Sequence, residues 1–389
     1  LLINRIGRKV LLGILGIILL VILLLQTDYI QNIIIGEVTK RLSKDLHTEV
    51  SIKHVSLSFF DKLDLDGTLI RDNHKDTLLY AGTMKVRITD WFFFKDKIDL
   101  KYIGLENALI DINRKDSVWN YQFIVDHFAS NDTSKKTSGK PILLNLQKID
   151  LKKVRFIQHD EWIGQTMTVK VGSMLADIEK TDFKNNSISV SSVDLDKPYF
   201  SIENFDGFRP DSLRKKNTDT GMYFNAGDLM LKVASIKMTD GIFISMLKGE
   251  VPDKGVFDGA NIRVSKINGN IENVSFIKDT IKAKVNLSAF ERSGFVLNKL
   301  KADFKLTPQI MEFSKLDIRT PGSRLGDYYA MRYKDFNEDM ADYIERVVMD
   351  ARFRNSTVSS DDIGRQIPPF YSPKKRPSPH ENSSAACPT

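Results

Sequence analysis

The chain has little of the side-chain chemistry that builds disulfide-stapled or metal-bound folds. Cys387 is the single cysteine among 389 residues, which excludes an internal disulfide framework and a zinc site made of cysteines. The six histidines form no H-x-H, H-x-x-x-H or H-E-x-x-H pattern, so a metal site on one helix is not indicated. We therefore expect neither a metal nor a cofactor.

Motifs for catalysis are missing as well. The sequence contains no G-x-S-x-G and no G-x-G-x-x-G. "TSGKP" at 137–141 is only superficially like a phosphate-binding loop, because Pro141 stands where Ser or Thr is needed. "LDLDG" at 63–67 lacks the distal glutamate of a calcium loop. We expect a protein that is not an enzyme and has no catalytic residues.

The net charge of +7 has little to do with the body of the chain. Three basic residues near the N-terminus supply +3, residues 364–389 supply another +3, and +1 remains for residues 26–363. A nearly neutral body argues against a nucleic-acid partner.

A long apolar run is present at the N-terminus. Val10–Leu25 has no polar residue and as a helix would be roughly 24 Å long, close to a bilayer core. Arg5, Arg8 and Lys9 precede it, so the positive-inside rule places that end in the cytoplasm and exports the rest. We expect residues 1–25 to be a transmembrane signal-anchor; the alternative is a cleaved signal peptide, which the absence of a small-x-small site disfavours.

The next segment, 26–47, has the spacing of an amphipathic helix. Its apolar stripe repeats every four residues and comprises Ile30, Ile34, Val38, Leu42 and Leu46. This pattern predicts a helix that leaves the membrane and packs against the domain that follows.

From residue 48 to 363 the apolar period changes to two, which is typical of strands. Met84, Val86 and Ile88 alternate with polar residues, and a phase slip at Lys53-His54 predicts a β-bulge. Turns are expected at Lys278-Asp279 and at "NGN" 268–270. Helices are expected only at Tyr121–Phe128 and Asp335–Val347, and loops near 130–141 and 204–222. The fold class is therefore mainly β with few short helices.

An apolar-Asp-apolar pattern recurs along these strands. "KIDLK" occurs at 97–101 and 148–152, and looser copies lie at 62–65, 192–195 and 315–318. The irregular spacing indicates a loose repeat. Because strand neighbours point to opposite faces, we expect these aspartates to face solvent and to discourage edge-to-edge pairing.

A sheet with one apolar face must bury it against a second sheet, a helix or a ligand. Three hypotheses follow: an apolar ligand groove, a tethered β-sandwich that acts as a binding module or adhesin, and an exported hydrolase in which Asp99 and Asp150 converge. The candidate groove-lining residues are Val86, Ile88, Ile98, Leu100, Ile149, Leu151, Val169 and Val171.

Several stretches resemble one family. They are "VSIKHVSLSFFDKLDLDGTLIRDNHKDTLLYAG" (Val50–Gly82), "LIDINRKDSVWNYQFIVDHF" (Leu109–Phe128), "SRLGDYYAMRY" (Ser323–Tyr333) and "RFRNSTVSSDDI" (Arg352–Ile363). With the N-terminal anchor they resemble the TamB proteins of the Bacteroidota, within the AsmA-like group, over roughly residues 10–363.

The resemblance implies a single-pass inner-membrane protein with a periplasmic body, a long twisted antiparallel β-groove with an apolar interior. It implies a role in outer-membrane biogenesis, as a phospholipid conduit or as part of a translocation and assembly module with an outer-membrane barrel partner. The chain departs from the family in its shorter length, its missing initial Met and the Pro-rich residues 364–389. We expect an N-terminal fragment whose tail is irregular, either disordered or aberrant.

Overall fold

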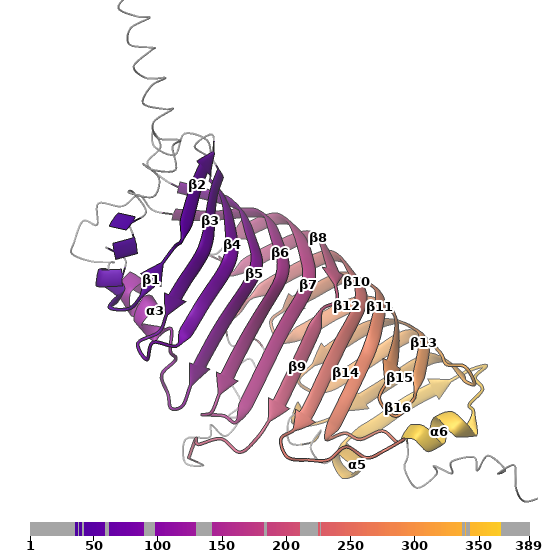
Figure 1. Ribbon diagram of the computed structural model, residues 1–389. Helices are drawn as coiled ribbons and strands as arrows, with labels where there is room; N and C mark the ends of the chain where they lie inside the picture. The colour runs from indigo at the N-terminus through magenta and orange to yellow at the C-terminus, as the bar shows by residue number, and fades with distance from the viewer. Residues whose placement is uncertain are drawn as a thin grey trace, which may run out of the picture.

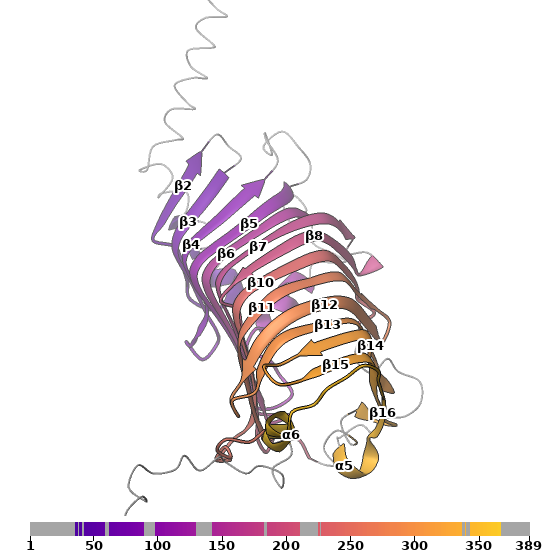
Figure 2. The same ribbon diagram turned by 90° about the vertical axis from the view of Figure 1, so that its right-hand side faces the viewer.

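The computed structural model describes residues 36–37, 39–40, 43–58, 62–88, 98–129, 142–182, 185–210, 225, 227–336, 339 and 343–366. This part of the chain is mainly β, as expected: sixteen strands form one sheet, and Figures 1 and 2 show that the sheet curves into an open arch. No helix in it is long and apolar enough to cross a membrane. The expected anchor, 1–25, lies outside the described residues.

The strands succeed one another along the arch almost in chain order. Their bounds are β1 Val50–Ser51, β2 His54–Ser58, β3 Lys62–Arg71, β4 Thr77–Ile88, β5 Ile98–Arg114, β6 Ile142–Asp160, β7 Gln165–Asp182, β8 Ser187–Asp196, β9 Tyr199–Asn204, β10 Met230–Leu247, β11 Asn261–Ile277, β12 Thr280–Glu291, β13 Val296–Thr307, β14 Ile310–Arg319, β15 Arg324–Arg332 and β16 Val348–Phe353.

Neighbouring strands run antiparallel except at two places. β5 pairs parallel with β6, and β10 pairs parallel with both β8 and β9. A parallel neighbour needs a crossover rather than a hairpin; residues 115–141, which contain α3 (Gln122–Ala129), make the first and residues 205–229 the second. The expectation of a wholly antiparallel sheet is wrong at these two places.

The helices are few and short. α3 matches the expected helix at 121–128. Within the expected helix at 335–347, residues 336, 339 and 343–346 are helical, the last four being α5 (Tyr343–Arg346), and residues 337–338 and 340–342 lie outside the described part. α6 (Ser360–Gln366) enters the segment expected to be irregular from 364, so that boundary lies three residues too early; residues 367–389 lie outside the described part. Residues 43–46 are helical and Leu46 is buried, while the other four stripe residues of the expected amphipathic helix are not described.

Two local expectations have opposite outcomes. Lys278-Asp279 is the two-residue turn between β11 and β12, as expected. "NGN" at 268–270 is not a turn but lies inside β11, where Gly269 has φ 139° and an added Cβ would sit 2.1 Å from the carbonyl oxygen of Asn286. The glycine there permits close approach of two backbones rather than chain reversal.

A row of bends crosses the sheet from β3 to β10. We call it the crease row. Strand pairing places its members opposite one another: Gly67, Gly82, Asn107, Lys153, Gly172, Lys197 and Asp240. All of them except Gly82 and Gly172 have φ between 48° and 61°, the left-handed region that bends a strand. At Gly82 an added Cβ would lie 3.1 Å from Asn107 Cβ, so a larger residue here would crowd the bent neighbouring strand.

The crease row extends to the edge of the sheet. β1 and β2 are separate pieces of one line along β3, and the break between them, at Ile52-Lys53, lies opposite Gly67. The phase slip that the sequence shows at Lys53-His54 is therefore a break between two strands. β8 and β9 are likewise two pieces along β7, interrupted at Lys197-Pro198.

The crease keeps one face of the sheet apolar on both of its sides. Residues three apart normally point to opposite faces of a strand. Across the crease, however, such pairs pack into one cluster, in which Ala81, Ala108 and Val154 are buried and Met84, Leu105, Leu151 and Val171 pack against them. In the strands that carry a left-handed residue, that residue shifts the alternation by one, so the strand bends without exchanging its faces.

Candidate functional site

The apolar face carries continuous rows of side chains that run from strand to strand. One row crosses ten strands on one side of the crease. Each residue in it lies directly opposite the next one on the neighbouring strand. It consists of Leu63, Val86, Ile103, Ile149, Ala176, Val193, Ile236, Ile271, Val285 and Ala302. At a strand spacing of about 4.8 Å, nine intervals make this first row roughly 43 Å long.

A second row lies on the other side of the crease and crosses eight strands. Its members are Ile70, Leu79, Ile110, Phe156, Val169, Phe200, Phe243 and Val264. Phe200 and Phe243 stack with ring centroids 5.9 Å apart. Most residues in the two rows are only partly buried, so the apolar surface is not enclosed by the described chain.

The opposite face is polar, and it carries the repeated aspartates. Asp64, Asp150, Asp194 and Asp317 lie in one registered row with Lys85, Lys237 and Lys301. Cross-strand ion pairs accompany them, such as Lys299–Asp317 at 2.8 Å and Lys148–Asp177 at 3.2 Å. Other residues on the intervening strands, mostly lysine and asparagine, separate these aspartates, which form no common site.

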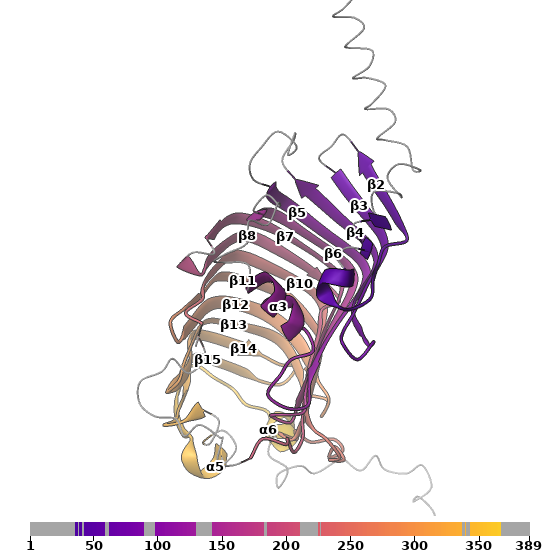
Figure 3. The same cartoon turned by 90° about the vertical axis from the view of Figure 1, so that its left-hand side faces the viewer.

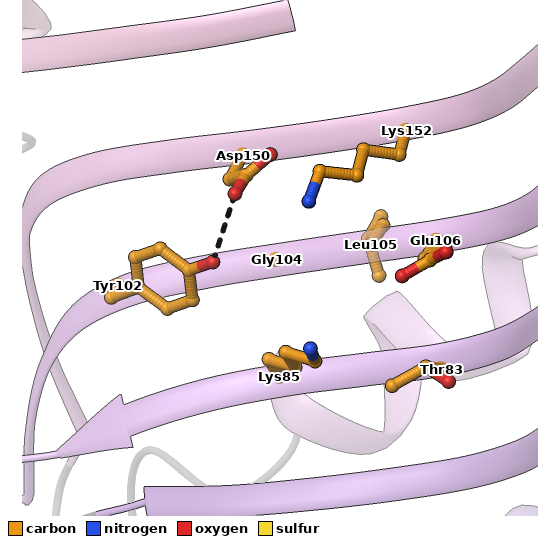
Figure 4. A pocket seen from close by; sticks show the side chains of 8 residues that line it. All are labelled: Thr83, Lys85, Tyr102, Gly104, Leu105, Glu106, Asp150 and Lys152. Atoms are coloured by element: carbon orange, nitrogen blue, oxygen red, sulfur yellow. Dashed lines mark hydrogen bonds between the residues drawn. The ribbon is translucent and has the colours of Figure 1, made fainter. Parts of the chain in front are cut away.

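Figure 4 looks onto this polar face, with a helical ribbon behind the sheet. Figures 1 and 3 place α3 inside the curve of the arch. The polar face is therefore the convex, outer one and the apolar face is the concave, inner one.

The polar hollow in Figure 4 is too small to be a ligand site. Lys85, Lys152 and Glu106 border it, and the Tyr102 hydroxyl donates a hydrogen bond of 3.3 Å to Asp150 Oδ2. Burial, followed by the Asp150 charge, raises the pKa of Tyr102. The volume of about 20 Å³ suits a single water molecule.

The acid pair of the hydrolase hypothesis does not converge. On β5 and β6, Asp150 pairs with Gly104, whereas Asp99 pairs with Leu143. Five residues of β5 separate these positions, which is roughly 16 Å along the strand. Among the described side chains no group of three or more His, Cys, Asp or Glu is arranged to hold a metal ion.

Five of the eight expected groove-lining residues lie along the concave face. Val86 and Ile149 lie in the first row and Val169 lies in the second. Leu151 and Val171 pack against the buried cluster at the crease. Leu100 pairs with Ile88 at one end of β5, and Ile98 pairs with Ile142; the side chains of Ile88 and Ile98 lie outside the described residues. The structure brings five of the eight onto one continuous surface.

At one end of the strands the apolar surface gives way to a polar rim that the sequence did not reveal. Asp160 is 1% exposed and accepts two hydrogen bonds from Arg114, at 2.8 and 2.7 Å. The Arg114 guanidinium lies 4.5 Å from the centre of the Trp119 ring. These residues come from different strand ends, and the parallel pairing of β5 with β6 brings them together.

A second part of the rim is built on Asp72, which is also 1% exposed. Its carboxylate accepts hydrogen bonds from the backbone N–H groups of His74 and Asp76, both at 2.9 Å, and from Asn120 Nδ2 at 3.1 Å. Asn120 Oδ1 in turn accepts a hydrogen bond from the N–H of Asn113. One buried carboxylate thus fixes the β3–β4 turn to the segment that precedes α3.

No protein-family model matches this chain, and no curated protein matches it.

Proposed function

We propose that the chain is a membrane-anchored, periplasmic lipid conduit that carries phospholipid acyl chains along the concave face of its arch. One observation carries the proposal: the first row presents ten consecutive apolar positions across ten strands. An acyl chain that covers such a row gains about 0.8 kcal/mol for each buried methylene.

The arrangement of the sheet favours a groove over a sandwich. The strands of the described part form a single sheet, whereas a β-sandwich needs a second sheet to cover the apolar face. Soluble proteins rarely leave apolar patches beyond a few hundred Å² without a binding role. An acyl chain fits a row of this length in which every position is apolar.

The N-terminal sequence and the family resemblance supply the setting of this proposal. The apolar run at 10–25 would anchor the arch in the inner membrane, and the resemblance to TamB proteins places the body in the periplasm. In that setting the conduit would serve outer-membrane biogenesis, with an outer-membrane barrel protein as the partner that receives lipid or protein cargo.

The proposal is tested by site-specific photo-crosslinking in cells that make the membrane-bound protein. A photoreactive side chain replaces Ile149, which lies in the first row on the concave face. The matched control places the same group at the adjacent Asp150, which lies on the convex face. Adducts are identified by mass spectrometry.

Phospholipid adducts at 149 and not at 150 are the expected result. Equal adducts at both positions would reflect nonspecific membrane contact and would contradict the conduit. Protein adducts alone at 149 would mean that another polypeptide covers the concave face, and the tethered binding module would then be the better explanation.

A further inference from the structure

A cavity lies where the polar rim meets α3. It has a volume of about 530 Å³, within the range of ligand sites. Its walls are the β3–β4 turn, the end of β5, the segment before α3 and one side of α3 itself. The lining side chains include His74, Asp76, Arg114, Lys115, Trp119 and Asp126.

The walls of this cavity are held in place by buried polar contacts. Asp72 binds the backbone of the β3–β4 turn and the side chain of Asn120. Arg114 is held by its two hydrogen bonds to buried Asp160 and stacks on Trp119. A ligand would therefore meet a preorganised site, which lowers the ordering cost of binding.

Charges of both signs face the cavity without a partner. Among the described residues, the side chains of Asp76, Lys115 and His74 form no hydrogen bond or ion pair, and all three are exposed. Asp126 accepts one hydrogen bond, from Gln122 Nε2 at 2.9 Å, which leaves its second carboxylate oxygen available. The cavity therefore offers carboxylates and a cation at the same time.

The cavity borders both faces of the sheet at the end of β5, because Asn113 and Arg114 both line it and point to opposite faces. On β5, Arg114 shares a face with Ile112 and Ile110, because alternate residues point the same way. Ile110 belongs to the second apolar row. Four residues separate Arg114 from Ile110, about 13 Å of strand. A polar head held in the cavity would thus place an attached acyl chain on the second row.

We propose that this cavity binds a zwitterionic head group in which a primary ammonium lies beside a phosphate. The carboxylates of Asp76 and Asp126 would accept hydrogen bonds from the ammonium, and Lys115 with His74 would face the phosphate. This inference rests on the proposed lipid conduit and adds head-group selection at the end of the arch that carries α3. An anionic head group without an ammonium would meet the carboxylates unpaired.

The experiment uses the full chain in detergent and two soluble probes, glycerophosphoethanolamine and glycerophosphoglycerol, titrated by calorimetry. The wild type should bind the ethanolamine probe at least tenfold more tightly, since a hydrogen bond between charged groups is worth about one decade or more in affinity. The Asp76→Asn/Asp126→Asn variant should lose that preference. Asp206→Asn, an exposed aspartate outside the cavity, is the matched control and should keep it.

Equal affinity for the two probes, or a preference that survives the double variant, would overturn the inference. The Ile149 crosslink separates this failure from failure of the conduit. Lipid adducts at 149 together with no head-group preference would refute head-group selection alone. Selective binding of the soluble probe together with no lipid adduct at 149 would overturn the lipid assignment and leave a site for free phosphoethanolamine compounds.

Discussion

The crease row predicts that two neighbouring lysines respond oppositely to the same substitution. Lys153 has φ 51° and lies opposite Asn107 and Gly172, whereas Lys152 has no positive φ. Both side chains are exposed, so neither change removes buried surface. Lys153→Val should destabilise the fold and Lys152→Val should not.

The size of the effect follows from backbone sterics. A left-handed residue other than glycine costs roughly 1–3 kcal/mol; lysine bears the low end of this cost in the wild type, and a β-branched side chain bears the high end. Lys153→Val should therefore lower the free energy of unfolding by about 1–2 kcal/mol. Lys152→Val, in ordinary strand geometry, should change the free energy of unfolding by only about 0.3 kcal/mol in either direction. Lys153→Gly should lie within about 1 kcal/mol of wild type, because relief of strain offsets the entropy of glycine.

The assay is chemical denaturation of the detergent-solubilised protein, followed by circular dichroism in the strand region. The denaturant concentration at the unfolding midpoint should be near that of wild type for Lys153→Gly and Lys152→Val. It should be clearly lower for Lys153→Val. If Lys153→Val and Lys152→Val unfold at the same denaturant concentration, the left-handed residues do not hold the bend and the explanation of the crease fails.

Two further predictions concern charged groups. Arg114→Leu should destabilise the fold by about 3–5 kcal/mol because it leaves the buried Asp160 carboxylate without its cation, and the double variant Arg114→Leu/Asp160→Leu should recover much of that loss; a single variant within about 1 kcal/mol of wild type in denaturation would contradict this. Hydrogen bonds from Arg319 and Lys299 lower the pKa of Asp317 to about 2, so its carboxylate stabilises the folded state above about pH 4 and this contribution is lost as the pH falls towards 2. Wild type and Asp317→Asn should accordingly differ in melting temperature at pH 7 and converge near pH 2; an equal difference at both pH values would refute the assignment.

The strands and their apolar faces were predictable because alternation is a local property. Met84 and Val86 lie on the face that their spacing indicates, and the helix at Tyr121–Phe128 is present as α3. Hairpin partners follow from turn signals such as Lys278-Asp279. These features depend on residues close together in the chain, so the sequence carries them directly.

The crease was harder to predict because it rests on residues with no strong preference for left-handed geometry. Lysine at 153 and 197 does not mark a bend as glycine or asparagine would. A usable signal was present in the phase of the apolar residues, since Leu105 and Ala108, like Leu151 and Val154, are three apart and still share a face. The positive-φ residues of the row recur after 40, 46, 44 and 43 residues, which is more regular than the aspartate repeat.

The rim could not be predicted because it depends on long-range register. Arg114 and Asp160 are 46 residues apart, and Asp72 and Asn120 are 48 apart. Arg114 meets Asp160 through the parallel pairing of β5 with β6, and Asn120 meets Asp72 from the crossover segment that follows β5. No local pattern around Asn120 or Asp160 distinguishes a buried hydrogen-bonded residue from an ordinary loop residue.

The two apolar rows differ in length, and under the proposed function this difference gives the conduit a direction. The second row reaches Val264 on β11 and then meets Glu291, a buried carboxylate, on β12. The first row continues through Val285 and Ala302. Near α3 an acyl chain can therefore contact both sides of the crease, whereas beyond β11 it contacts one side only.

Movement along the first row exchanges one aliphatic neighbour for another at steps of about 4.8 Å, so no single step loses much apolar contact. The wide end, beside the polar rim and α3, suits entry of lipid from the membrane, and the narrow end suits its release.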